Sequence, residues 1–151
     1  MGTPASTYVI DETEETYDKP ATLVRIYRQA DGYPSGQGVD LAKYLLTGEI
    51  VNGLHFDDRE LVEWNGIDDF AAALVCHLKD GPGGIYIVPI ESGWETSYSY
   101  VVALTKRGWR VDVYGGDLSD DDRIFSGTPE ELLKTAKSKP RSVAARAEDW
   151  N

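Results

Sequence analysis

The sequence predicts an α+β domain, with a largely antiparallel sheet and two or three helices packed on one face of it. Three observations predict this fold. Two alternating apolar segments flank a short turn within 97–114, a helical apolar spacing runs over 67–79, and a capping signal precedes a helix at 129–138. The chain has 151 residues, the length of one ordinary domain. We expect one globular domain over 20–139, a flexible acidic segment over 1–19 and a flexible basic tail over 140–151.

The first predicted strand covers 21–28, because ATLVRIYR is rich in β-branched and aromatic residues. The turn formers of DGYPSGQG (31–38) end it, and DLAKYLL (40–46) then has helical spacing up to Gly48. Residues 49–65 give no clear signal. The helix over 67–79 carries apolar residues at i, i+3, i+4, i+7 and i+11, with Asn65 placed as its cap and Gly81-Pro82 after it.

The second half of the chain reads as antiparallel sheet. GIYIVPI (84–90) is a strand whose Pro89 places its end at an edge or a bulge, and 97–105 with 109–114 forms a hairpin. A short strand is predicted at 123–125. The last helix has a capping box from Thr128 to Glu131 and a proline at its first position.

The charge excludes some functions. There are 26 acidic and 15 basic residues, a net charge of -11, so generic binding to nucleic acid or to an anionic membrane is not expected. No apolar run approaches the roughly 18 residues of a membrane span, and the first residues lack the pattern of a signal peptide. The single cysteine cannot form an internal disulfide. We expect a cytoplasmic protein.

No catalytic constellation is recognisable. Cys76 and His77 are neighbours on a predicted helix and point about 100° apart, and Cys76 beside the apolar stripe is expected to be buried. Asp117, Ser119 and Asp121 match the first, third and fifth positions of a calcium-binding loop, but Asp122 and Thr128 stand where that loop needs glycine and glutamate. We therefore expect no catalytic residue, no metal site and no cofactor.

The segment around 31–38 is the candidate ligand-binding loop. It follows a strand and precedes a helix, whose free amides and a nearby arginine suit an anion or a nucleotide. It lacks both the lysine of a phosphate-binding loop and the third glycine of a dinucleotide fingerprint, and an ordinary strand-to-helix turn is the alternative. The candidate residues are Arg28, Asp31, Gly32, Tyr33, Ser35, Gly36, Gln37 and Gly38.

Acidic runs at 11–18, 57–69 and 117–122 are candidate surfaces for a protein partner. The usual alternative for such runs is solvated surface. The candidate partner-binding residues are Asp57, Asp58, Glu60, Glu63, Asp120, Asp121 and Asp122.

The stretches IYRQADGYPSGQGVDLAKYL, GIDDFAAALVCHLK and GPGGIYIVP carry a resemblance. Through a YRxxDGYPxGxG pattern the chain resembles small uncharacterised proteins of phages and bacterial mobile elements, over about residues 21–105. The resemblance implies an accessory phage product that acts in a host cytoplasm. It transfers no catalytic residue.

Three functions remain open at this point. The first is a non-enzymatic accessory protein that binds a host protein or a small molecule, as in evasion of a bacterial defence. The second is an acidic DNA mimic that occupies the nucleic-acid channel of a host protein, which requires the acidic runs to share one face. The third is a small enzyme acting on a nucleotide or nucleic acid through Arg28, Asp31 and Tyr33. The sequence leaves open whether the chain forms a homo-oligomer.

Overall fold

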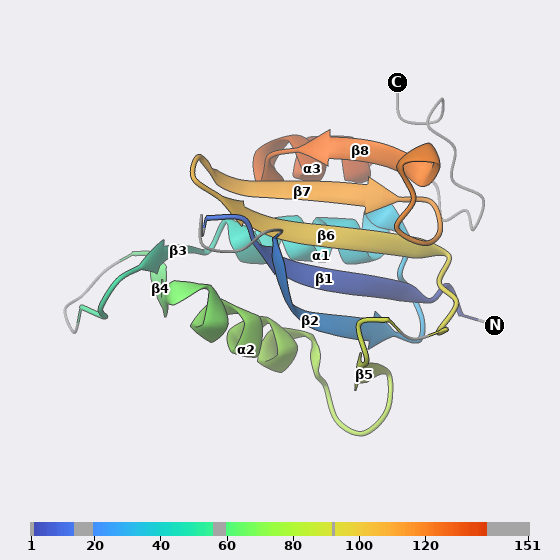
Figure 1. Cartoon of the computed structure of the whole chain (residues 1–151), viewed down its shortest axis with the longest axis horizontal. Helices are drawn as coiled ribbons and strands as arrows, with labels where there is room; N and C mark the ends of the chain where they lie inside the picture. Colours follow the sequence, from blue (N-terminus) through green and yellow to red (C-terminus); the bar gives the residue numbers. More distant parts are fainter. Residues whose placement is uncertain (1, 14–19, 56–59, 92, 139–151) are drawn as a thin grey trace.

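The computed structural model of the chain describes residues 2–13, 20–55, 60–91 and 93–138. It contains a six-stranded sheet, a small two-stranded sheet and three α-helices (Figure 1). The strands of the large sheet are β1 (Ala5–Asp11), β2 (Ala21–Arg28), β5 (Ile85–Val88), β6 (Tyr98–Thr105), β7 (Gly108–Tyr114) and β8 (Arg123–Gly127). The helices are α1 (Val39–Leu45), α2 (Gly66–Leu78) and α3 (Pro129–Ala136), and the small sheet pairs β3 (Gly48–Val51) with β4 (Val62–Asn65).

The large sheet has the strand order β5-β2-β1-β6-β7-β8. Every neighbouring pair is antiparallel except β1 and β6, which run parallel with Thr7 beside Tyr100. The sheet is thus mixed and mostly antiparallel, and the predicted α+β class is confirmed. A parallel pair needs a long connection between its two strands. The connection from β1 to β6 contains α1, α2 and the small sheet.

One face of the large sheet carries the main core. Val9, Ile26, Tyr100 and Val102 point to this face and pack with the buried residues of α1, α2 and α3. In Figure 1, α1 and α3 lie behind the sheet, so the viewer sees the opposite face. We call this opposite face the open face. Because all three helices contribute to one core, the prediction that the helices share a face of the sheet agrees with the structure.

Most predicted elements are confirmed. The helix α2 buries Phe70, Leu74 and Leu78 as its apolar spacing requires, and β6 and β7 form the predicted hairpin. At the start of α3, the Thr128 side chain accepts a hydrogen bond from the backbone N–H of Glu131, whose own side chain completes the capping box. The strand β5 lies at the edge of the sheet and ends one residue before Pro89.

The N-terminal boundary differs from the prediction. Ala5–Asp11, expected within a flexible segment over 1–19, forms β1 at the centre of the sheet. Val9 is fully buried on the helix face, and Tyr8 is 7% exposed on the open face. The side chains of this strand alternate between the two faces, with Val9 in the main core and Tyr8 on the open face, but Tyr8, Val9 and Ile10 form one short apolar run and the acidic run directly after it dominates the composition. Residues 14–19 and the predicted tail over 140–151 lie outside the described residues.

Two details of α2 differ from the prediction. Asn65 is at the N-cap position as predicted, but its side chain does not cap the helix; instead its backbone N–H donates to the Asp69 carboxylate at 2.7 Å, and its side-chain oxygen accepts from the backbone N–H of Gly53. Cys76 is exposed rather than buried, because the buried stripe of α2 consists of residues on the other side of the helix. None of the described helices has the length and apolar character needed to cross a membrane.

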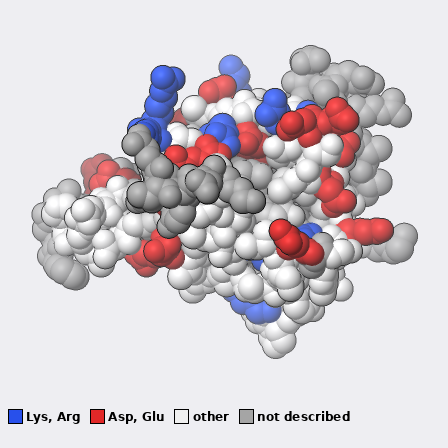
Figure 2. All heavy atoms as spheres, viewed as in Figure 1, with Lys and Arg blue, Asp and Glu red and all other residues white. Residues whose placement is uncertain are grey.

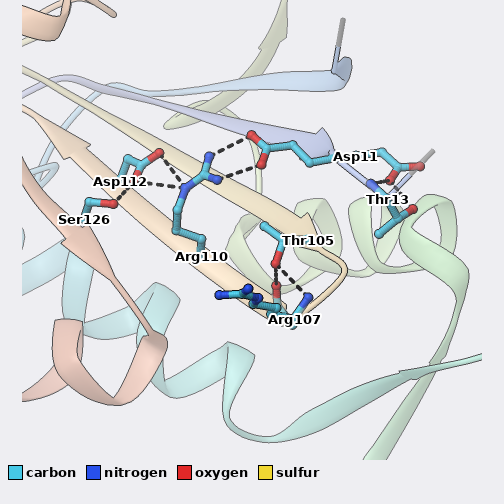
Figure 3. A network of polar contacts seen from close by, with 9 residues as sticks. Asp11, Thr13, Thr105, Arg107, Arg110, Asp112 and Ser126 are labelled. Carbon is cyan, nitrogen blue, oxygen red and sulfur yellow. Dashed lines mark hydrogen bonds and ion pairs between the residues drawn. The ribbon is translucent and has the colours of Figure 1, made fainter. Parts of the chain in front are cut away.

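A polar network crosses the open face near the β6–β7 hairpin (Figure 3). The guanidinium of Arg110 donates two hydrogen bonds of 2.7 Å to Glu12 and also bonds Asp112, whose carboxylate accepts from the Ser126 hydroxyl. The hydrogen bond to Glu12 is the main reason why the pKa of Arg110 is raised. The network ties the residue after β1 to β7 and β8, so this part of the open face is structural.

Candidate functional site

Side-chain hydrogen bonds join the loop over 31–38 to the strands beside it. Gln37 is 1% exposed, and its side-chain nitrogen donates to the Thr7 hydroxyl at 3.0 Å. Its side-chain oxygen accepts a 2.6 Å hydrogen bond from the guanidinium of Arg28, which also donates to the carbonyl of Ala30 at 2.7 Å. Two of the predicted ligand-binding side chains therefore hold the loop against the sheet.

The backbone of the loop is also engaged. The N–H of Gly32 donates to the carbonyl of Thr3, and its carbonyl accepts a 2.7 Å hydrogen bond from the Tyr100 hydroxyl. A Cβ at this position would lie 2.5 Å from the Cβ of Ala5, so only glycine permits the close approach to β1. Burial raises the pKa of Tyr100 well above its ordinary value, which keeps this donor protonated. Gly32 is needed for packing, whether or not a ligand binds.

Of the eight predicted loop residues, two line the small recess beside the loop. Arg28 and Asp31 line a recess of about 230 Å³ together with Asp80 and Gly84, and Asp31 adopts a left-handed φ of 61°. The remaining six candidates do not line this recess: Gly32, Tyr33, Ser35, Gly36, Gln37 and Gly38. The arrangement matches the alternative of a strand-to-helix turn more closely than it matches a ligand loop.

The described acidic candidates fall into two separate groups. Glu60 and Glu63 lie at or next to β4, beside the small sheet at the left of Figure 1, whereas Asp120, Asp121 and Asp122 lie between β7 and β8 at the right. These groups are at opposite ends of strands about 23 Å long, as eight residues of β6 imply. On the face shown in Figure 2, acidic side chains gather in several groups with basic side chains between them. Asp57 and Asp58 lie outside the described residues.

The histidines and the cysteine form no catalytic pair. His77 stacks on Tyr44 with ring centroids 4.0 Å apart and contacts Asp40 at 3.1 Å, so it joins α2 to α1. His55 contacts Glu63 at 2.8 Å. Within the described ranges, no group of three or more His, Cys, Asp or Glu side chains is arranged to hold a metal ion.

The open face carries a cavity that the sequence did not predict. Its volume is about 480 Å³, within the range of ligand sites in proteins. Tyr8 of β1 lies in it with Trp94 and Glu95 from the β5–β6 connection and Asp117 from the β7–β8 connection. We call it the open-face cavity, and its remaining lining residues are Thr22, Arg25, Ile90, Gly93 and Leu118.

Arg25 holds one wall of the open-face cavity in place. It is only 3% exposed, and its guanidinium donates to the Ser6 hydroxyl at 3.0 Å and to the carbonyls of Ile90 and Trp94 at 3.3 and 2.9 Å. It also lies over the Tyr8 ring, 5.4 Å from the ring centroid. Since these bonds fix two points of the β5–β6 connection, the wall that contains Trp94 is preorganised.

Trp94 belongs to a cluster of three aromatic rings with Tyr27 and Tyr86. The Trp94 ring meets Tyr27 edge to face with centroids 4.7 Å apart, yet it remains 45% exposed. Burial, with a further contribution from Asp117, raises the pKa of Tyr8 against the opposing effect of Arg25. Tyr8 is therefore a neutral hydroxyl at ordinary pH, and the carboxylate of Asp117 is close enough to act on it.

One lining residue of the open-face cavity, Trp94, could be noticed in the sequence. Trp94, Tyr98 and Tyr100 are noticeable as an aromatic cluster near a loop–strand junction. The structure separates them, because Tyr98 and Tyr100 turn into the main core and Trp94 faces the open-face cavity. Tyr8 reaches the cavity through the pairing of β1 with β2, in which Tyr8 lies opposite Arg25.

A second, larger recess of about 540 Å³ lies near the start of α2. Its lining contains Asp11, Asn65 and Asp68 but no aromatic or basic side chain. Asp11 accepts hydrogen bonds from Thr13, and Asn65 accepts one from Gly53, so two of its polar side chains serve the local backbone. The open-face cavity is therefore the stronger candidate site.

Comparison with known proteins gives no family assignment: no family model, curated protein or solved structure matches the chain.

Proposed function

We propose that this protein is a non-enzymatic binding protein, an accessory protein of the phage type, and that the open-face cavity is its recognition site. The observation that carries the proposal is the composition of this cavity. It combines the exposed ring of Trp94 and the side chain of Tyr8 with two carboxylates, Glu95 and Asp117, on a wall that Arg25 fixes. Rigid aromatic anchors beside a few polar groups are typical of recognition sites.

The state of the carboxylates supports a recognition role. Glu95 and Asp117 are exposed, and among the described residues neither forms an ion pair or accepts a side-chain hydrogen bond. By contrast, the carboxylates of Glu12 and Asp112 elsewhere on this face are both bonded to Arg110. The cavity therefore contains two carboxylates that are available to a ligand.

The groups considered for catalysis favour binding over an enzymatic role. Arg28 bonds Gln37 and Ala30, and Tyr33 does not line the recess that Arg28 and Asp31 share. The three side chains thus lack the common site that general acid–base or phosphoryl chemistry needs. A DNA mimic is less well supported, because the described acidic groups lie at opposite ends of the sheet.

The proposal is tested by affinity capture from host lysate, with mass spectrometry of bound proteins and extracted small molecules. The variants Trp94→Ala and Asp117→Asn are compared with the wild type. Leu61→Ala and Glu49→Gln are matched controls, because Leu61 has the same 45% exposure as Trp94 and Glu49 is an exposed acid on the small sheet.

We expect a protein or metabolite that the wild type and both controls retain and that both cavity variants lose. Retention of the same species by all five proteins would contradict the cavity as the site. Retention of no species by the wild type, at saturating lysate, would contradict a binding function in that host.

A further inference from the structure

We infer that the open-face cavity binds an organic cation, the guanidinium or ammonium group of a basic side chain on a partner protein. This inference rests on the proposed function and adds the chemistry of the ligand. It follows from the charges of the lining, from the exposed aromatic wall, and from the use that the structure makes of Arg25.

The charged lining of the open-face cavity is acidic on balance. Two carboxylates, Glu95 and Asp117, stand against one guanidinium, which leaves one net negative charge. Both carboxylates come from connections outside the sheet, and both residues are exposed to solvent. A cation that enters can form charge-assisted hydrogen bonds with them.

The aromatic side chains suit the same ligand. Trp94 is the best of the aromatic residues for a cation–π contact, and 45% of its surface is exposed although Tyr27 supports its edge. Arg25 already lies over the Tyr8 ring, so Tyr8 is available mainly through its hydroxyl, which its raised pKa keeps neutral. A neutral hydroxyl can accept a hydrogen bond from an N–H donor.

Arg25 does not make the cavity an anion site. Its side chain is 3% exposed and its guanidinium donates to Ser6 and to the carbonyls of Ile90 and Trp94. An anion would have to lie near two carboxylates in order to reach this buried group. Arg25 therefore stabilises the wall of the cavity, and the carboxylates of Glu95 and Asp117 determine that the ligand is positively charged.

The charge of the whole chain favours a basic protein as the source of the cation. With a net charge of -11, the protein attracts basic partners over the range of electrostatic steering and repels acidic ones. A free amine gains much less from this field than a surface with several basic groups. The partner is thus expected to present an arginine or lysine beside further basic residues.

The test uses isothermal titration calorimetry with three related peptides. The first is acetyl-GSKRSG-amide, the second has citrulline and norleucine in place of arginine and lysine, and the third has phosphoserine in place of serine. Citrulline and norleucine keep the shape of arginine and lysine without their charge. Free arginine amide is the fourth probe. We expect the basic peptide to bind about tenfold to a hundredfold more tightly than the neutral one, the range of charge-assisted hydrogen bonds.

The variants locate the effect. Trp94→Ala and Asp117→Asn should each weaken binding of the basic peptide by about tenfold. The controls Leu61→Ala and Glu49→Gln should leave it unchanged. Because surface pairs are screened, the affinity should also fall as salt is added.

Several results would overturn the inference. Equal binding of the basic and neutral peptides, or tighter binding of the phosphopeptide, would exclude a cation site. Binding of arginine amide as tight as that of the peptide would exclude a protein source. If no peptide binds but lysate capture still depends on Trp94, the cation chemistry fails while the proposed function stands; if neither depends on Trp94, both fail.

Discussion

Gln37, on the turn before α1, donates a hydrogen bond to the hydroxyl of Thr7 in the middle of β1, 30 positions earlier in the chain. Gln37 is 1% exposed and the same side chain accepts from Arg28. The distinctive DGYPSGQG segment thus connects β1, β2 and α1 through one buried amide. The glutamine of this segment is explained by this structural role.

Replacing Thr7 by valine tests that role. Thr7→Val keeps the shape of the side chain but leaves a buried N–H of Gln37 without its acceptor. We expect a loss of about 1–3 kcal/mol in the free energy of unfolding, measured by denaturant titration. Thr135→Val, at a half-buried position of α3, is the control and should change stability by less than about 0.5 kcal/mol. Equal effects of the two substitutions would show that the buried bond contributes nothing.

Arg28→Ala distinguishes a structural loop from a ligand loop. The guanidinium bonds the Gln37 side chain and the carbonyl of Ala30, so its loss should destabilise the fold by about 1–3 kcal/mol. Binding of the captured partner, measured below the unfolding transition, should remain within about twofold of the wild type. A variant of wild-type stability that has lost its partner would restore the loop at 31–38 as the binding site.

The central position of β1 makes the N-terminal residues essential to the fold. Val9 is fully buried between β2 and β6, so Val9→Ala should cost about 2–3 kcal/mol through the two lost methyl groups and the cavity they leave. The exposed neighbour Leu23, at 37% exposure, is the control and should cost less than about 1 kcal/mol as Leu23→Ala. Thermal unfolding of a chain that starts at residue 13 should show no cooperative transition. A normal transition for this shortened chain would contradict the position of β1.

Tyr100 should make stability depend on alkaline pH. Burial raises its pKa well above the ordinary value of 10, so folding opposes its ionisation. The stability linked to this group is fully present below about pH 10 and is lost as the pH rises towards the pKa in the folded state. Tyr100→Phe should lower the free energy of unfolding at neutral pH by about 1–3 kcal/mol, because the carbonyl of Gly32 loses its hydrogen-bond donor. The variant should also lose less stability than the wild type as the pH rises above about 10. Denaturant titrations over a series of pH values measure both, with exposed Tyr86→Phe as the control.

Elements with strong local signals could be predicted from the sequence. The apolar spacing of α2, the alternation in β6 and β7 and the capping box of α3 are local properties, and each is found where it was expected. The strand β1 could not be recognised from composition, because a seven-residue strand precedes a run of acids. Its pairing with β6, more than 90 residues later, is set by the packing of the whole sheet.

The open-face cavity depends on three segments that are distant in the sequence. Tyr8, Trp94 and Asp117 meet only because β1 lies between β2 and β6 and both connections fold over the same face. Local patterns draw attention to Trp94 and to Asp117 separately, but no local pattern indicates that either lies beside Tyr8. The loop at 31–38 is the opposite case, because its local sequence resembles a binding site. The hydrogen bonds of Gln37, of the Gly32 carbonyl and of the neighbouring Arg28 stabilise the fold instead.

The most direct test of the open-face cavity as the recognition site is a map of backbone amide chemical shifts during titration with the basic peptide. We predict that the largest shifts fall on Tyr8, Thr22, Trp94, Asp117 and Leu118, which line the cavity. Shifts confined to Arg28, Asp31, Gly83 and Gly84, which line the smaller recess, would contradict this prediction and place binding beside the 31–38 loop.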